Sequence, residues 1–281
     1  MTDSTPAAPP LAPLLIEAGR AEAHYWRDLW RYRELFYFLT WRDLLVRYKQ
    51  TAIGVAWAVL QPALTTVVFT IFGSILQLPT GGIPRPVLIF AAQLPWSFFS
   101  SALSASSGSL VGNAHLISKV YFPRLIIPAS AVAVSLVDFL ISAAFFAVLL
   151  VAYRLVPDWH LLALPLFLCL GFGAALGGGL WLTALNVKYR DFRFVVPFLI
   201  QFGFYISPIA FTTTLVPPRW RTLYSLNPMV GVIDGFRWSL LRGRTPLDPT
   251  AVLISAGAVV VLLWSGIRYF RRTERSFADI I

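Results

Sequence analysis

Six long stretches of this chain contain almost no charged side chain, and the short segments between them hold most of the charge. About 20 apolar residues suffice for a helix to cross the hydrocarbon core of a bilayer. Backbone polar groups in lipid must be satisfied within the segment, so such runs form helices. With 57% hydrophobic and 13% charged residues, the sequence predicts an all-α integral membrane protein. Its six transmembrane helices are expected near 53–78, 86–110, 125–153, 161–186, 194–212 and 250–267.

The basic residues between these spans predict a topology. Loops 112–124 and 187–193 hold two and three basic residues, whereas loops 79–85 and 154–160 hold one each. Cytoplasmic loops of membrane proteins carry the excess of Lys and Arg. The first two loops and both arginine-rich termini are therefore expected in the cytoplasm, which requires an even number of spans. Residues 1–22 are expected to be a disordered tail, and residues 23–281 a single transmembrane domain.

Residues 223–241 form a further apolar stretch, which Pro228 and Gly231 interrupt. A seventh span here would move the arginine-rich C-terminus to the outside. We therefore expect a re-entrant or interfacial helical pair over 217–242 on the external side, where irregular backbone is tolerated if protein or a cavity covers it. Asp234 and Arg237 are three residues apart, a spacing that allows them to pair on one helical face.

Segment 24–50 is predicted to be an amphipathic interface helix that precedes the first span. An aromatic stripe at helical spacing lies beside a basic stripe, an arrangement that suits a helix in the lipid headgroup layer. The alternatives are a plain membrane anchor and an anchor that also contacts a cytosolic partner. Thr40 followed by Asp43 resembles a capping box, so a break in the helix is expected near residue 40.

Several kinds of chemistry are absent from the sequence. None of the three lysines stands in a G-K-[ST] phosphate loop, and the three histidines are too scattered for a metal site. Any use of ATP must therefore come from another chain. The net charge of +10 does not indicate nucleic-acid binding, because the basic residues gather at the ends of apolar runs, as a topology signal does.

Asp138 is the only acidic residue within a predicted span, about 20 Å along its helix. An intramembrane acid is by default a functional candidate, and the alternative is a carboxyl that ties helices together. Rows of small residues in two spans favour close helix packing, although the serines offer a hydroxyl-lined path as an alternative. These rows are Ser97, Ser100, Ser101, Ser104 and Ser107 in the second span and Gly171, Gly173, Gly177, Gly178 and Gly179 in the fourth.

An ordered set of short strings carries a family resemblance. The strings are RYKQTAIG (47–54), WAVLQP (57–62), LPWSFF (94–99), LISKVYFPR (116–124), NVKYRD (186–191) and LNPM (226–229). Together they resemble the membrane (permease) subunit of type-2 ABC exporters, of the polysaccharide-export kind typified by the Wzm O-antigen permeases. The resemblance covers about residues 24 to 272, and the set in this order is far more specific than any one string.

The resemblance implies a homodimer in the bacterial inner membrane that exports a lipid-linked polysaccharide, O-antigen or a related surface glycan. Separate cytosolic ATPase subunits would bind ATP and Mg, and this chain would hold no cofactor. A coupling helix would lie at 113–121, so the ATPase-contact residues are expected to be Asn113, His115, Leu116, Lys119, Tyr121, Arg31 and Arg42. The channel and gate residues are expected to be Tyr224, Asn227, Met229, Trp238, Trp96, Phe98, Phe99 and Ser104.

Three other functions compete with this one. Within the same fold, the chain would export another substrate, such as teichoic acid, a lipid or a drug. A membrane glycosyltransferase needs acidic or basic groups gathered at one membrane face, and the acids here are dispersed. A secondary transporter usually needs a relay of ionisable groups within the membrane. The predicted spans hold a single acid, Asp138, which disfavours this function.

Overall fold

The computed structural model describes residues 25–49, 54–189 and 191–277. Within these ranges every regular element is a helix, which confirms the predicted all-α class. The tail predicted at residues 1–22 lies outside the described residues.

Five described helices are long and apolar enough to cross a bilayer, and they follow the predicted runs of apolar residues closely. They are α3 (Gly54–Ile75), α4 (Arg85–Gly112), α6 (Ile126–Ala152), α7 (Leu164–Lys188), which the 3-10 turn η2 (Trp159–Ala163) precedes, and α11 (Pro249–Thr273).

The fifth predicted span, 194–212, differs from the structure. The corresponding helix α8 (Phe192–Ile206) has only 15 residues and ends six residues before the predicted limit. Its end has a local cause: Ser207 precedes Pro208, and a residue before proline is driven out of the helical region. The backbone at Ser207 is accordingly extended, with φ −91° and ψ 151°.

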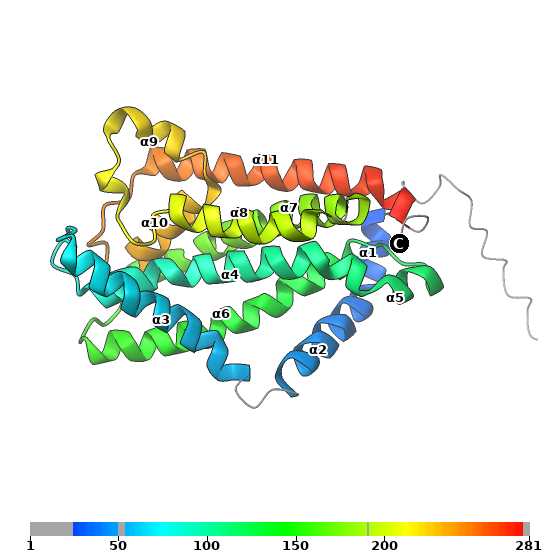
Figure 1. The fold of residues 1–281 in the computed structure, drawn as a ribbon, viewed down its shortest axis with the longest axis horizontal. Coiled ribbons are helices and arrows are strands. Elements are labelled where there is room, and N and C mark those ends of the chain that lie inside the picture. Colours follow the sequence, from blue (N-terminus) through cyan, green and yellow to red (C-terminus); the bar gives the residue numbers. More distant parts are fainter. Residues whose placement is uncertain (1–24, 50–53, 190, 278–281) are drawn as a thin grey trace, which may run out of the picture.

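The long helices run roughly lengthwise in a bundle, with the short helices gathered at its two ends (Figure 1). Helices α1 (Tyr25–Arg31) and α5 (Ala114–Lys119) lie at the same end as the C-terminus, which we call the terminal end. Helices α9 (Pro218–Tyr224) and α10 (Pro228–Leu240) lie at the opposite end. The chain therefore crosses the bundle an even number of times.

Helix α4 is the centre of the bundle. In its most apolar window 72% of the residues are buried, compared with 17–33% for the other four long helices. It packs against α3, α6, α7, α8 and α10. The exposed surfaces of the other four long helices must therefore contact lipid or another protein in the membrane.

The glycine row of α7 allows a close approach to its neighbours. A Cβ at Gly177 would lie 2.7 Å from the backbone N and Cα of Leu263, on α11. A Cβ at Gly179 would lie 2.6 Å from Oγ of Ser106, on α4. The glycines therefore serve the packing role that their spacing predicts, because a larger side chain would push the helices apart.

The predicted interface helix is two helices, α1 and α2 (Arg33–Lys49), which meet at Tyr32. The break expected near residue 40 is wrong. Thr40 lies inside α2, and its hydroxyl donates to the carbonyl of Phe36, 2.8 Å away, instead of capping a new helix. Ser and Thr hydroxyls inside a helix can donate to the carbonyl four residues earlier, so the Thr-x-x-Asp pattern does not by itself mark a helix start.

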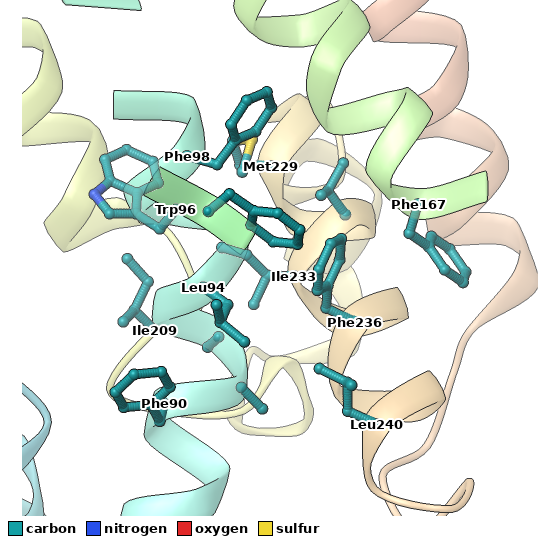
Figure 2. Close-up of a cluster of buried hydrophobic side chains, with 14 of the residues drawn as sticks. Phe90, Leu94, Trp96, Phe98, Phe167, Ile209, Met229, Ile233, Phe236 and Leu240 are labelled. Carbon is teal, nitrogen blue, oxygen red and sulfur yellow. The ribbon is translucent and has the colours of Figure 1, made fainter. Parts of the chain in front are cut away.

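Helices α9 and α10 form the short pair expected at 217–242, and α10 packs in the core beside α4. Figure 2 shows side chains of α4 and α10 facing one another, with Phe98 of α4 near Met229 of α10 and Leu94 of α4 near Ile233 of α10. Asn227 caps α10 by accepting from the backbone N–H of Met229 at 3.0 Å. Ser255 of α11 accepts from the N–H of Gly231 and donates to the carbonyl of Ser225, and α10 packs between α4 and α11.

Arg237 of α10 is fully buried, and two of the carbonyls that it binds, those of Ile209 and Phe211, lie outside the helices. Its guanidinium donates to the carbonyls of Ile209 and Phe211, both at 2.8 Å, and to that of Leu88 at 3.2 Å. Asp234 instead accepts from the hydroxyl of Thr213 at 2.5 Å. The two residues expected to pair with each other thus bind neighbouring parts of the segment that follows α8.

Candidate functional site

A groove of about 810 Å³ runs along the bundle between α3, α4, α6 and α8, and the end of α2 contributes to it. Its wall is unusually polar for a membrane protein. Hydroxyl and amide side chains come from all four of these helices, among them Gln61 of α3, Ser101 of α4, Ser142 of α6 and Gln201 of α8. Polar side chains on membrane-spanning helices are costly when they face lipid. Their concentration along one groove therefore indicates that the groove holds water or a polar molecule.

The serines of α4 divide between two faces of the helix. Ser97, Ser100, Ser101 and Ser104 line the groove, whereas Ser107 is buried against α7. On that second face Thr183 donates to the carbonyl of Ser106 at 2.7 Å, and Asn186 donates to that of Ser107 at 2.9 Å. The packing role predicted for the serine row thus applies to one face, while the other face lines the groove, where a hydroxyl-lined path stays a prediction.

Aromatic rings flank the polar wall of the groove. Trp96 lies 5.5 Å from Phe99 and 5.9 Å from Phe204 of α8, measured between ring centroids. Trp96 and Phe98 both line the groove, whereas Phe99 packs beside them, half-buried. Trp96 and Phe98 are almost fully buried, so of these groove-lining rings the half-buried ring of Phe204 is the one that offers an apolar surface beside the hydroxyl groups.

Asp138 lies on the groove wall and is bound by the end of α2. Arg47 places Nη2 2.6 Å from Oδ2 of Asp138, and the hydroxyl of Tyr48 donates to Oδ1. Sequence reasoning identified the acid but not these partners, because they are about 90 residues away and lie on a helix assigned to the membrane surface.

The residues expected to form the gate lie away from the groove. Met229 is buried in the core, and the ring of Trp238 meets His160 edge-on at a centroid distance of 4.4 Å. Asn227 donates to the hydroxyl of Ser207 at 3.1 Å, and Tyr224 lies beside Phe211. None of the four is among the groove-lining residues of the described chain.

A family model described as "ABC-2 type transporter" matches residues 34–241, which include the groove, the Arg47–Asp138 pair and the α9–α10 pair. The chain belongs to the ABC-2 type transporter family.

Several curated proteins are similar to this ABC-2 type chain over most of their length. An "O-antigen export system permease protein RfbA" of Myxococcus xanthus is 30% identical over 91% of this chain and 98% of its own. A protein of the same description from Klebsiella pneumoniae is 27% identical over 88% and 95%. The "Polysialic acid transport protein KpsM" of Escherichia coli is 25% identical over 84% and 92%.

At the terminal end, the ABC-2 type chain presents the residues expected to contact an ATPase. His115, Lys119 and Tyr121 are exposed on and just after α5, and Leu116 packs inward, half-buried. Arg42 of α2 donates to the side-chain oxygen of Asn113 at 2.8 Å. The structure thus brings α2 to the junction of α4 and α5 at Asn113, while Arg31 is exposed on α1.

Proposed function

We propose that this chain forms a homodimer that exports a lipid-linked polysaccharide, O-antigen or a related surface glycan, across the bacterial inner membrane. A separate cytosolic ATPase, which binds ATP and Mg, supplies the energy. Family membership supports a transport subunit, and the names of the three relatives support a polysaccharide substrate.

The polar groove is the observation that carries this proposal. Gln61, Ser104 and Gln201 line it, yet all three are exposed in the isolated subunit. Facing lipid, these groups would lack hydrogen-bond partners. A second copy of the chain, with its own groove opposite, would enclose them in a shared channel. The hydroxyls and amides would then meet the sugar hydroxyls, and the ring of Phe204 would stack on a sugar face.

The positions of the basic residues support the orientation of the channel. The terminal end holds the basic loops after α4 and α7, so under the positive-inside rule it faces the cytoplasm. The ATPase would dock there on α5 and the neighbouring surface of α1 and α2. The opposite end then faces outward, and the α9–α10 pair covers the external end of each subunit.

The proposal is tested by blocking the groove in the cell. Deleting the gene should leave completed lipid-linked glycan on the cytosolic leaflet and remove it from the surface. Ser104→Trp fills the groove and should fail to restore surface glycan. Leu253→Trp adds the same bulk on the exposed outer face of α11 and should restore it.

Two outcomes would contradict the proposal. Full export by a well-expressed Ser104→Trp variant would show that the groove is not the path. Glycans that are shortened or never completed in the deletion strain, instead of accumulating, would point to a glycosyltransferase.

A further inference from the structure

A second pocket, of about 690 Å³, lies at the terminal end between α1, the segment before α6 and the end of α11. It shares no lining residue with the groove. Five arginines line it against two acids, Asp28 and Glu274, which gives a formal excess of three positive charges. Tyr121 and the α1 residues of its wall belong to the surface on which the ATPase is proposed to dock, but the transport function proposed above gives no role to the arginines of α11.

One face of α11 passes from apolar to basic as it enters the pocket. Val261 and Trp264 are more than 60% exposed on the outer surface of the helix. Arg268 and Arg272 follow at spacings of four residues, so they continue the same face. The guanidinium of Arg268 lies over the ring of Trp264, 5.7 Å from its centroid. Along α11 an apolar residue is thus followed by a tryptophan and then by arginines, the order typical of the boundary between the hydrocarbon core and the lipid headgroups.

The pocket is prearranged by contacts among its own walls. Arg124 donates to Glu274 through its backbone N–H, at 2.8 Å from Oε1, and through its guanidinium to the carbonyl of the same residue. Arg271 lies over the ring of Tyr25 of α1, 4.5 Å from the centroid. These contacts join α1, the start of α6 and α11, while Arg268 and Arg272 remain exposed at the mouth.

We propose that this pocket binds the phosphate headgroup of an anionic phospholipid, with Arg268 and Arg272 as the principal ligands. The acyl chains would lie along Val261 and Trp264. A guanidinium binds phosphate oxygens through two parallel hydrogen bonds, and basic pockets between membrane helices at the cytoplasmic face suit acidic headgroups. The continuous apolar face of α11 favours a lipid over a soluble protein, which would meet only the polar part.

Native mass spectrometry of the purified full-length chain tests this site. The wild type should retain added phosphatidylglycerol and not phosphatidylcholine. The variant Arg268→Gln/Arg272→Gln should bind phosphatidylglycerol about tenfold or more weakly, since each juxtamembrane basic residue contributes on the order of 1 kcal/mol. The matched control is Lys188→Gln/Arg193→Gln. These two residues are exposed at the same end and also lie over aromatic rings, and their loss should leave lipid retention unchanged.

A measurement on the wild type alone guards against a variant that fails to fold. Phosphatidylglycerol should raise its unfolding temperature more than phosphatidylcholine does. Equal retention of the two lipids by the wild type would overturn the proposal, as would an equal loss in the variant and the control. A variant that keeps phosphatidylglycerol but no longer binds the ATPase would assign the pocket to protein docking instead.

Discussion

The carboxylate of Asp138 and the guanidinium of Arg47 form an ion pair, 2.6 Å between Oδ2 and Nη2, that joins the middle of α6 to the end of α2. Tyr48 donates to the other carboxylate oxygen. Partial burial and this bond to Asp138 raise the pKa of Tyr48, so its hydroxyl remains a proton donor at neutral pH. Of the two readings that the sequence leaves open, these contacts favour an acid that ties helices together.

Replacing this acid by its amide tests that reading. Asp138→Asn can still accept from Tyr48 but loses the charge that attracts Arg47. We expect stability to fall by about 0.6 to 2 kcal/mol in thermal unfolding, with most export retained. Asp191→Asn, at an exposed acid, is the control and should change neither. Complete loss of export with a normal amount of folded protein would show instead that Asp138 acts directly in transport.

Arg237 should be among the most sensitive positions in the chain. Arg237→Met keeps the apolar volume but leaves the carbonyls of Ile209 and Phe211, which lie outside the helices, without their donor. Each unsatisfied buried group costs about 1–3 kcal/mol, so for two carbonyls we expect a loss of at least about 2 kcal/mol, seen as low expression and early thermal unfolding. Arg219→Met changes an exposed arginine at the same end and should be nearly neutral. Equal stability of the two variants would contradict the role given to Arg237.

The contact between α7 and α11 should tolerate no side chain at Gly177. Gly177→Ala places a methyl group against the backbone of Leu263, and overpacking of this kind costs about 1–3 kcal/mol. Gly257→Ala on α11 has nothing within 4 Å of its new Cβ, so it should be neutral or stabilise the helix by up to about 1 kcal/mol. Thermal unfolding in detergent compares the two. A Gly177→Ala variant as stable as Gly257→Ala would show that the helices can separate freely.

The long helices could be predicted from the sequence because lipid imposes one strong rule, an uncharged run of about 20 residues. The contacts between helices could not. In α1 and α2 the aromatic stripe that stands out in the sequence is exposed at Trp26, Trp30, Tyr37 and Trp41 and turns inward only at Tyr48. A less conspicuous stripe packs inward along both helices, with Leu39 fully buried and Tyr25, Leu29 and Phe36 beside it. Spacing reveals a stripe, but it does not say which of two stripes meets protein and which meets headgroups.

The candidate site shows the same limit. The serine row and Asp138 were identifiable because polar groups are rare within spans. Their partners were not, since Arg47 and Asn186 lie 91 and about 80 residues away from the groups they bind. Arg237 carries an even weaker signal. A charge in an interrupted apolar segment predicts a local pair with Asp234, whereas the fold supplies three carbonyls from distant segments.

Cysteine labelling tests the topology after Cys169 is replaced by serine. Val156→Cys lies in the exposed loop between α6 and η2, and should react with a membrane-impermeant maleimide in intact spheroplasts. Lys119→Cys on α5 and Asp191→Cys before α8 are also exposed, but at the terminal end. They should react only after permeabilisation. Labelling of position 191 from outside would exclude the arrangement with both termini in the cytoplasm.

The hydrogen bond from Arg42 to Asn113 predicts that docking of the ATPase and coupling to it can be separated. Lys119→Glu reverses an exposed charge on α5 and should reduce co-purification of the ATPase. Asn113→Ala removes the contact with α2, together with a bond from the Asn113 amide to the carbonyl of Ser109 within the same turn. The exposed surface of α5 is unchanged, so the ATPase should still bind while export per ATP hydrolysed falls. The measurement is ATP hydrolysis and glycan transport in proteoliposomes containing both subunits.

Lys188→Glu, at an exposed lysine of the same end outside α5, is the control. If Lys119→Glu retained full binding and export, α5 would not be the docking element. If Asn113→Ala transported as efficiently as the wild type, the bond between α2 and α5 would be structural only.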